Sequence, residues 1–136
     1  MARSAQSRRF EQRLAAIPAR VKEAVVPALA KSAEEIADTM KHLAPVDSGD
    51  LLHSIHVTLP GQSTPPYSQP GGMRVAGETE ALVTAGNEDV RYPHLVEYGT
   101  ADAAAQPFFW PAFRLGRKRA ANRIKRAVAK AVKGAS

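Results

Sequence analysis

The first long amphipathic pattern of the chain predicts a helix from Pro18 to about Leu43. Apolar residues recur there at spacings of three and four, which places them on one helical face; they are Leu29, Ala33, Ile36, Met40 and Leu43. Ala44-Pro45 ends the pattern, because a residue before proline is pushed out of helical geometry. Pro27 cannot donate a backbone hydrogen bond, so we expect a kink there or a second helix that begins near Val26.

An alternating pattern of apolar and polar residues follows a predicted single helical turn at residues 47–52. Ile55, Val57 and Leu59 alternate with polar neighbours, which predicts a strand over residues 54–59 with one buried face. Residues 73–76 and 80–85 are predicted to form the arms of a hairpin that turns at residues 77–79. Together these segments predict an antiparallel sheet of three to four strands.

The segment between these strands, residues 60–72, is rich in proline and glycine and poor in apolar side chains. It is too long for a tight hairpin and cannot form a core of its own. We therefore expect it to project as a flexible loop that becomes ordered only against another ring or a neighbouring subunit.

Two helices are predicted in the last third of the chain. Residues 92–100 form a short helix closed by Gly99, whose backbone freedom suits the position after a helix end. A longer helix runs from Pro111 to about Lys133, and Gly134 stops it. Its apolar stripe is expected to dock on the sheet, with Phe113 in the core; the stripe consists of Phe113, Ala120, Ile124, Val128 and Val132.

These elements predict one α+β domain over residues 1–136. An antiparallel sheet of three to four strands is packed by a long N-terminal helix and a basic C-terminal helix, and residues 1–17 form an N-terminal arm. The 136 residues include no cysteine, which excludes disulfides and thiolate metal sites and fits assembly in a reducing cytoplasm. No apolar stretch approaches the length needed to span a bilayer, so we expect no membrane contact.

The net charge of +6 is unevenly distributed along the chain. Residues 1–20 are basic and residues 21–102 are acidic, whereas residues 103–136 carry nine basic side chains and no acidic one. This segregation predicts contact with a polyanion such as DNA, or association that places the basic end of one subunit on the acidic body of the next. A solvated helix face is the simpler alternative.

The residues that could support catalysis do not form a recognisable site. The histidines lack the spacing and the supporting carboxylate of a metal pair; they are His42, His53, His56 and His94. Ser54 lies between two of them without the turn that exposes a nucleophile. Gly71-Gly72 lies outside the strand and helix context of a phosphate-binding loop. We therefore expect a non-enzymatic protein with no metal and no other cofactor.

Three sequence blocks, in order, resemble the pattern of a known family. Residues 44–51 read Ala-Pro-Val-Asp-Ser-Gly-Asp-Leu and are followed by Ser54-Ile55. Residues 92–100 read Tyr-Pro-His-Leu-Val-Glu-Tyr-Gly-Thr, and residues 106–113 read Gln-Pro-Phe-Phe-Trp-Pro-Ala-Phe. Their order and spacing resemble the gene-product-ten-like family of HK-type lambdoid phages, which are head-tail connector, neck or tail-completion proteins. The proline-rich residues 60–72 and the strongly basic tail depart from that pattern.

The resemblance implies a structural virion protein that forms a ring at the phage head-tail junction. As a tail terminator, neck or tail-completion protein, it would join the head connector to the tail tube around the DNA channel, after assembly in the host bacterial cytoplasm. The particle would be a phage or a related gene transfer agent. Expected partners are copies of the same chain in a ring, the head connector or stopper, tail tube proteins, and packaged DNA through non-specific contact. A ring of six copies is expected, and a ring of twelve is the open alternative.

On this interpretation the sequence offers candidates for the surfaces of the subunit. Aromatic and arginine side chains are enriched at the energetic centres of protein interfaces, which favours interface positions for Tyr98 and Trp110, while Phe108 is expected in the core. The predicted subunit interface comprises Glu97, Tyr98, Gly99, Thr100, Trp110, Arg119, Arg123 and Arg126. Arg117 and Lys130 are predicted to face the DNA channel.

A second class of function remains open, namely a small basic nucleic-acid-binding regulatory protein whose C-terminal helix follows phosphates by charge. No aromatic residues are interleaved with that helix and no helix-turn-helix pattern surrounds it, so sequence-specific recognition is not predicted. A regulator should bind free duplex DNA with a steep salt dependence, whereas a ring subunit should bind DNA weakly and associate with connector or tail-tube proteins.

Overall fold

The computed structural model describes residues 19–46 and 49–135, so the predicted arm at residues 1–17 lies outside the described residues. It confirms the α+β class with a long helix at each end of the described chain. Helix α2 (Ala19–Leu43) is one helix that includes Pro27. The alternative of two helices meeting near Val26 is therefore wrong. Pro27 lies on the exposed side of α2, where water can satisfy the backbone carbonyl that a proline leaves without its helical donor.

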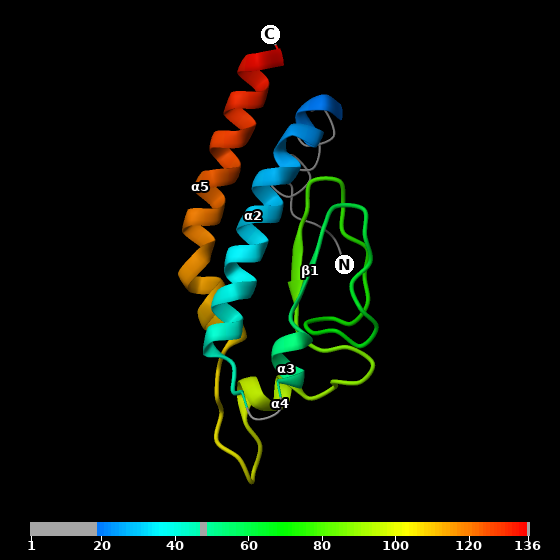
Figure 1. The fold of residues 1–136 in the computed structure, drawn as a ribbon, viewed down its shortest axis with the longest axis vertical. Coiled ribbons are helices and arrows are strands. Elements are labelled where there is room, and N and C mark those ends of the chain that lie inside the picture. The colour runs from blue at the N-terminus through cyan, green and yellow to red at the C-terminus, as the bar shows by residue number, and fades with distance from the viewer. Residues whose placement is uncertain (1–18, 47–48, 136) are drawn as a thin grey trace, which may run out of the picture.

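The C-terminal helix α5 (Phe109–Ala135) runs antiparallel to α2 and packs along it (Figure 1). It begins before the predicted Pro111 and continues through Gly134, which does not stop it. Helix α2 lies between α5 and the sheet, so the predicted docking of α5 on the sheet is wrong. The two helices approach closely at Gly116, where a Cβ atom would lie 2.7 Å from Cγ1 of Ile36.

This arrangement leaves part of the predicted apolar stripe of α5 in solvent. Phe113 is 41% exposed and Val132 is 53% exposed, so the predicted core position of Phe113 is wrong. Because a single helix is narrower than a sheet, α2 cannot cover the whole predicted stripe. It covers the flank of α5 that carries Phe109 and Ala112, which are buried. Phe108 is 1% exposed, which confirms the prediction that it lies in the core. The core cluster comprises Ile36, Ala37, Met40, Ala44, Leu51, Ile55, Ala85, Phe108, Phe109 and Ala112.

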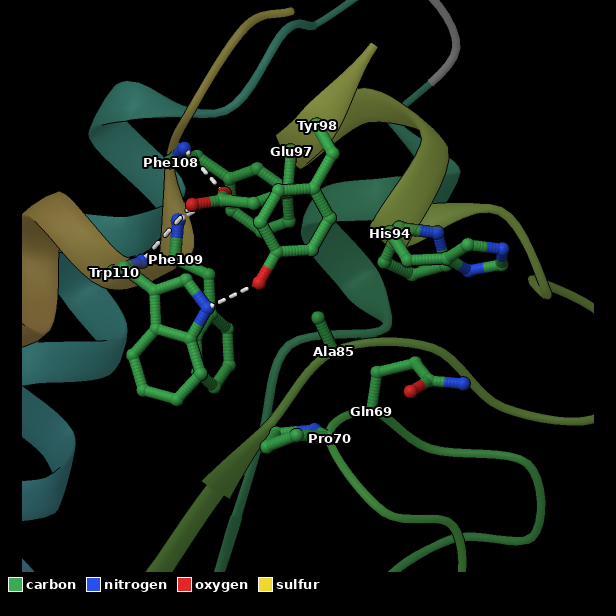
Figure 2. A pocket seen from close by; sticks show the side chains of 10 residues that line it. Gln69, Pro70, Ala85, His94, Glu97, Tyr98, Phe108, Phe109 and Trp110 are labelled. Carbon is green, nitrogen blue, oxygen red and sulfur yellow. Dashed lines mark hydrogen bonds between the residues drawn. The ribbon is translucent and has the colours of Figure 1, made fainter. Parts of the chain in front are cut away.

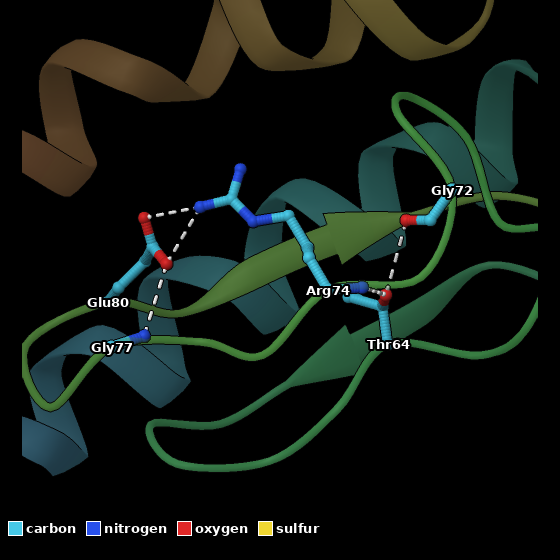
Figure 3. Close-up of polar contacts among 5 residues, drawn as sticks. All are labelled: Thr64, Gly72, Arg74, Gly77 and Glu80. Atoms are coloured by element: carbon cyan, nitrogen blue, oxygen red, sulfur yellow. Dashed lines mark hydrogen bonds and ion pairs between the residues drawn. The ribbon is translucent and has the colours of Figure 1, made fainter.

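The sheet of the described residues has two antiparallel strands, β1 (His56–Thr58) and β2 (Leu82–Thr84), with Val57 opposite Val83. The predicted three to four strands are not confirmed. The predicted hairpin between residues 73–76 and 80–85 is wrong, because Val75 pairs with Ser63 instead. The Glu80 carboxylate binds the Arg74 guanidinium and the Gly77 N–H (Figure 3). These contacts hold residues 74–80 in a turn, and residues 73–76 pair with the segment around Ser63 and not with residues 80–85.

Residues 60–72 fold back over the sheet, so the prediction that they project is wrong. Thr64 and Ser68 are 2% and 0% exposed. The segment is held by polar contacts: the Arg74 N–H donates to Thr64 Oγ1 at 2.8 Å (Figure 3), and Gln69 pairs with Ala85. A chain segment with few apolar residues can thus pack when its backbone groups find partners. The predicted mobility of this segment stays a prediction.

Part of the side of the sheet that faces away from α2 is buried as well, although His56 on that side is exposed. Val57 and Val83 pack against the core cluster, and successive residues of a strand point to opposite faces. Thr58 and Thr84 therefore lie on the far face, yet they are only 0% and 4% exposed. The alternating pattern correctly marked the core face but not the burial of the polar face.

Two short helices match the sequence prediction. Helix α3 (Asp50–His53) is the predicted single turn, and α4 (Pro93–Tyr98) ends at Gly99, whose φ of 77° requires a residue without a side chain. The buried Ser54 hydroxyl between them donates to the Leu51 carbonyl at 2.7 Å and accepts the Gly86 N–H at 3.0 Å. Ser54 therefore links α3 to the chain after β2.

Candidate functional site

The carboxylate of Glu97, at the end of α4, caps the first turn of α5. Oε1 accepts the backbone N–H groups of Phe108 at 2.8 Å and Phe109 at 2.9 Å, and Oε2 accepts that of Trp110 at 3.3 Å (Figure 2). The first N–H groups of a helix lack partners within the helix, and a negative charge there is favourable. Glu97 is 7% exposed. Although predicted at the subunit interface, its side chain is therefore used within the subunit.

Residues 99–107 turn back tightly and bring Phe108 to Glu97. A Cβ atom on Gly99 would lie 2.7 Å from the Ala105 nitrogen, so only glycine fits this approach. The Thr100 hydroxyl accepts the N–H groups of Asp102 and Ala103, which satisfies backbone groups at the exposed tip. Gly99 and Thr100, also predicted at the interface, shape this turn.

Tyr98 and Trp110 meet on the surface beside this turn. The Tyr98 hydroxyl accepts the Trp110 Nε1–H at 2.9 Å, while Tyr98 remains 69% exposed. Trp110 packs edge to face on Phe109 and Phe113, with ring centres 4.9 and 6.0 Å apart. Phe109, Trp110 and Phe113 form what we call the aromatic ladder. Phe109 and Trp110 of this ladder line a cavity of about 100 Å³, together with Pro70 and His94 (Figure 2).

A larger apolar groove lies on the other side of the aromatic ladder. It has a volume of about 310 Å³ and its walls come from α2, β2 and α5. The groove is lined by Leu29 and Ile36 of α2, by Val83 of β2, and by Phe113 and Ile124 of α5. The sequence did not indicate this groove, because the stripe of α5 was expected to be covered by the sheet.

Two of the predicted interface arginines bind helix α2 of the same chain. The Arg123 guanidinium contacts both oxygens of Glu35, at 2.8 and 2.9 Å, and donates to the Ser32 hydroxyl at 3.2 Å. Arg119 lies 3.7 Å from the same carboxylate. The hydrogen bonds from Arg123, together with the charge of Arg119, lower the pKa of Glu35 against the opposing effect of burial. The predicted pairing of basic helix with acidic body thus occurs partly within one subunit.

Three further basic residues of α5, for which an interface or DNA-channel position was predicted, are exposed. Arg117, Arg126 and Lys130 form no ion pair with the described part of the chain. They remain available to a neighbouring subunit or a polyanion.

The histidines do not converge on a metal site. His53 and His56 are both exposed, and the described residues contain no group of three histidine, aspartate or glutamate side chains that could hold a metal ion. Within residues 19–46 and 49–135, no helix combines the length and hydropathy required to cross a membrane.

Two functional contacts were missed by sequence reasoning. Glu35 carried no local signal, since its partner Arg123 is 88 residues away along the chain. The capping role of Glu97 was likewise hidden, because a cap supplied by another helix leaves no pattern next to the helix it caps. The one sequence indication of this contact was that the block at residues 92–100, which contains Glu97, is followed closely by the block at residues 106–113, which contains Phe108.

Comparison with known families matches residues 8–99 to the family described as "Bacteriophage HK97-gp10, putative tail-component". The match covers more than half of the chain, and the chain therefore belongs to this family. It is a phage tail component and a virion protein. No curated protein and no solved structure matched the chain. The predicted family is thus confirmed, and the match covers the first sequence block and residues 92–99 of the second, whereas the third block at residues 106–113 lies outside it.

Proposed function

We propose that the chain is the subunit of a homo-oligomeric ring of six copies at the phage head-tail junction. As a tail terminator, neck or tail-completion protein, it would join the head connector or stopper to the tail tube around the DNA channel and act without catalysis. Membership in a family of phage tail components over residues 8–99 supports this proposal most strongly. The exposed Tyr98, partly buried Trp110 and exposed Arg126 give such a subunit a surface for its neighbours.

The interface residues predicted from the sequence divide into two roles under this proposal. Tyr98, Trp110 and Arg126 would contact a neighbour, because their side chains reach solvent. Glu97 and Arg123 would act behind that surface by fixing α5 against α4 and α2. Arg117 and Lys130, both exposed on α5, are the candidates for the DNA channel.

Disrupting the gene in a producing phage tests the proposal. Negative-stain electron microscopy should then show filled heads and tails that remain separate, and supplying the chain in trans should restore joined particles. Tubes of abnormal length without the protein would indicate a terminator, because an end-binding ring limits tube growth. Leaking heads with normal tails would indicate a stopper. Normal infectious particles without the protein would contradict the proposal.

The basic α5 favours one other function, a nucleic-acid-binding regulatory protein. Nine basic side chains and no acidic one lie in residues 103–136, and Arg117, Arg126 and Lys130 are exposed. Such a protein would bind free duplex DNA with an affinity that falls steeply as salt increases. Fluorescence anisotropy with a labelled duplex, at about 50 and 200 mM salt, distinguishes it from a ring subunit that binds DNA only weakly.

A further inference from the structure

Strand β2 has an open outer edge on the side away from β1. The Ala85 backbone N–H and C=O both bind Gln69, at 3.0 and 2.8 Å, whereas the Gly86 N–H binds Ser54, which precedes β1 in the chain. Backbone groups of successive strand residues point to opposite edges, and those of residues two apart point to the same edge. The N–H and C=O of Val83 therefore face outward, like those of Ala85.

The segment that covers the end of this edge turns away from the rest of it. Regular pairing would place Gly71 opposite Val83, but the Gly72 N–H instead binds the Ser68 carbonyl at 2.8 Å and closes a turn. Neither Val83 nor Ala81 shares a backbone hydrogen bond with a described residue outside β1. Unpaired backbone groups at the edge of a sheet are a template for a further strand.

The open edge lies beside the apolar groove, because Ala81 and Val83 also line it. The groove has a volume of about 310 Å³, and Phe113 on its α5 wall is 41% exposed. A peptide that adds to a sheet edge is extended, and its alternate side chains enter pockets beside that edge. The edge and the groove together therefore specify an extended occupant with apolar side chains at alternate positions.

The charges around the groove specify a second property of the occupant. Arg117 shares the groove flank of α5, because it is spaced by three and four residues from groove residues of that helix. It is exposed and forms no ion pair with the described residues, and α5 contains no acidic residue. Glu35 and Glu80, which adjoin groove residues in the sequence, already bind arginines. Glu34 is exposed and has Lys31 three residues before it. Arg117 is thus left for a carboxylate of the occupant.

We propose that the outer edge of β2 and the groove bind an extended segment of a partner protein, with apolar residues at alternate positions and a carboxylate beside Arg117. The segment adds a strand to β2, and its apolar side chains fill the groove between α2 and α5. This binding site goes beyond the proposed ring function and does not depend on the number of copies in the ring. With Arg117 at the segment, Lys130 is left as the candidate for the DNA channel.

The charge requirement favours a different protein over segments of this chain. Residues 1–18 contain four arginines and one glutamate. The strand-like segment with the exposed Met73 and Val75 carries Arg74 between them. Each of these segments would bring arginine to the basic wall of α5, and like charges in contact are unfavourable.

A short synthetic peptide of alternating valine and glutamate is the probe for the site. Fluorescence anisotropy should detect its binding to the purified chain. N-methylation removes backbone donors, and in a strand the valine amides face one edge and the glutamate amides face the other. Methylation of one set should therefore weaken binding at least about tenfold, and methylation of the other set should have little effect. Equal effects of the two sets, or no binding of the unmodified peptide, would overturn the proposal.

A matched pair of substitutions on α5 tests the groove with the same peptide. Phe113→Glu places a charge in the groove and should weaken binding at least about tenfold. Leu115→Glu is the control, because Leu115 is 73% exposed and is not among the groove residues. Circular dichroism verifies that both variants are folded. Equal binding by the two variants would overturn the proposal.

Charge exchange tests the carboxylate beside Arg117. The original chain should prefer the valine–glutamate peptide over a valine–lysine peptide by about tenfold. Arg117→Glu should abolish or reverse this preference. Arg114→Glu makes the same charge change at another exposed position of α5 that is not among the groove residues, and should largely keep the preference. The same loss in both variants would show that only the net charge of α5 matters and would overturn the pairing.

Two measurements identify occupants from the chain itself. If deleting residues 1–18 raises the affinity for the peptide about tenfold or more, the chain's own N-terminal segment occupies the groove. If sedimentation velocity shows self-association that Phe113→Glu abolishes and the peptide competes with, a second copy occupies it. Either result would overturn the assignment to a different protein, whereas unchanged affinity and self-association independent of Phe113 would support it.

Discussion

Arg123 of α5 binds Glu35 of α2 through two nitrogen-oxygen contacts, at 2.8 and 2.9 Å, and thereby joins the two long helices. The hydrogen bonds from Arg123 lower the pKa of Glu35. A carboxyl group whose pKa is lower in the folded state stabilises the fold at a pH above its unfolded value, about 4.3. That contribution is lost as the pH falls through the lowered pKa of the folded state.

We therefore predict that Glu35→Gln weakens the dependence of stability on acid pH. The free energy of unfolding of the original chain should fall more steeply than that of the variant as the pH drops below about 4.3. Urea denaturation at a series of pH values measures both curves. Parallel curves would show that the Glu35 contact does not contribute to acid sensitivity.

The cap formed by Glu97 predicts a loss of stability when its carboxylate is removed. Glu97→Ala should lower the free energy of unfolding by about 2 kcal/mol, because the buried N–H groups of Phe108 and Phe109 lose their acceptor. Glu97→Gln keeps an oxygen acceptor but no charge, and should cost about 1 kcal/mol. Glu88→Ala, at an exposed acid, is the control and should change stability by less than about 0.5 kcal/mol. Equal unfolding midpoints for Glu97→Ala and Glu88→Ala would contradict the capping role.

The buried face of the sheet beneath residues 60–72 gives a prediction of opposite sign. The hydroxyl of Thr58 has no hydrogen-bond partner among the described residues, so Thr58→Val should raise the free energy of unfolding by about 1 kcal/mol. Thr64→Val should lower it by about 1 kcal/mol, because Thr64 Oγ1 accepts the Arg74 N–H at 2.8 Å. Thermal unfolding compares the two. A loss of similar size in both variants would show that Thr58 is bonded after all.

The close approach of α2 and α5 predicts that two glycines of one helix respond differently to alanine. Gly116→Ala should be destabilising, because its Cβ would lie 2.7 Å from Cγ1 of buried Ile36 and overpacking costs about 1–3 kcal/mol. Gly134→Ala meets nothing within 4 Å and should be neutral or stabilising by up to about 1 kcal/mol. Differential scanning calorimetry of the two variants is the measurement. A gain of stability from Gly116→Ala would contradict the packing of α5 on α2.

The helices could be predicted from the sequence because their signals are local. Periodic apolar residues and Pro45 marked α2, and Gly99 marked the end of α4. The partner of each apolar face was not predictable in the same way. The stripe that includes Phe113 indicates that one side of α5 is apolar, but it does not specify whether a helix or a sheet covers it.

The other predictions that the structure contradicts depend on contacts between residues far apart in the sequence. Residues 60–72 were expected to project because they lack apolar side chains, yet the hydrogen bond between Arg74 and Thr64 and the pairing of Gln69 with Ala85 hold them on the sheet. Of the candidate surface, Tyr98 and Trp110 were identified from their aromatic character. The interface role of Glu97 stays a prediction, whereas its cap on α5 could not be predicted because it depends on a turn that only the folded chain defines.

The copy number of the chain in purified phage particles tests the central claim most directly. Quantitative mass spectrometry with isotope-labelled standard peptides, normalised to the portal protein of the same particles, measures it without altering the sequence. A ring at the head-tail junction predicts a small fixed number, six in our account, that remains with joined particles after high-salt washing. Particles that are complete and infectious but contain none of the chain would contradict the account.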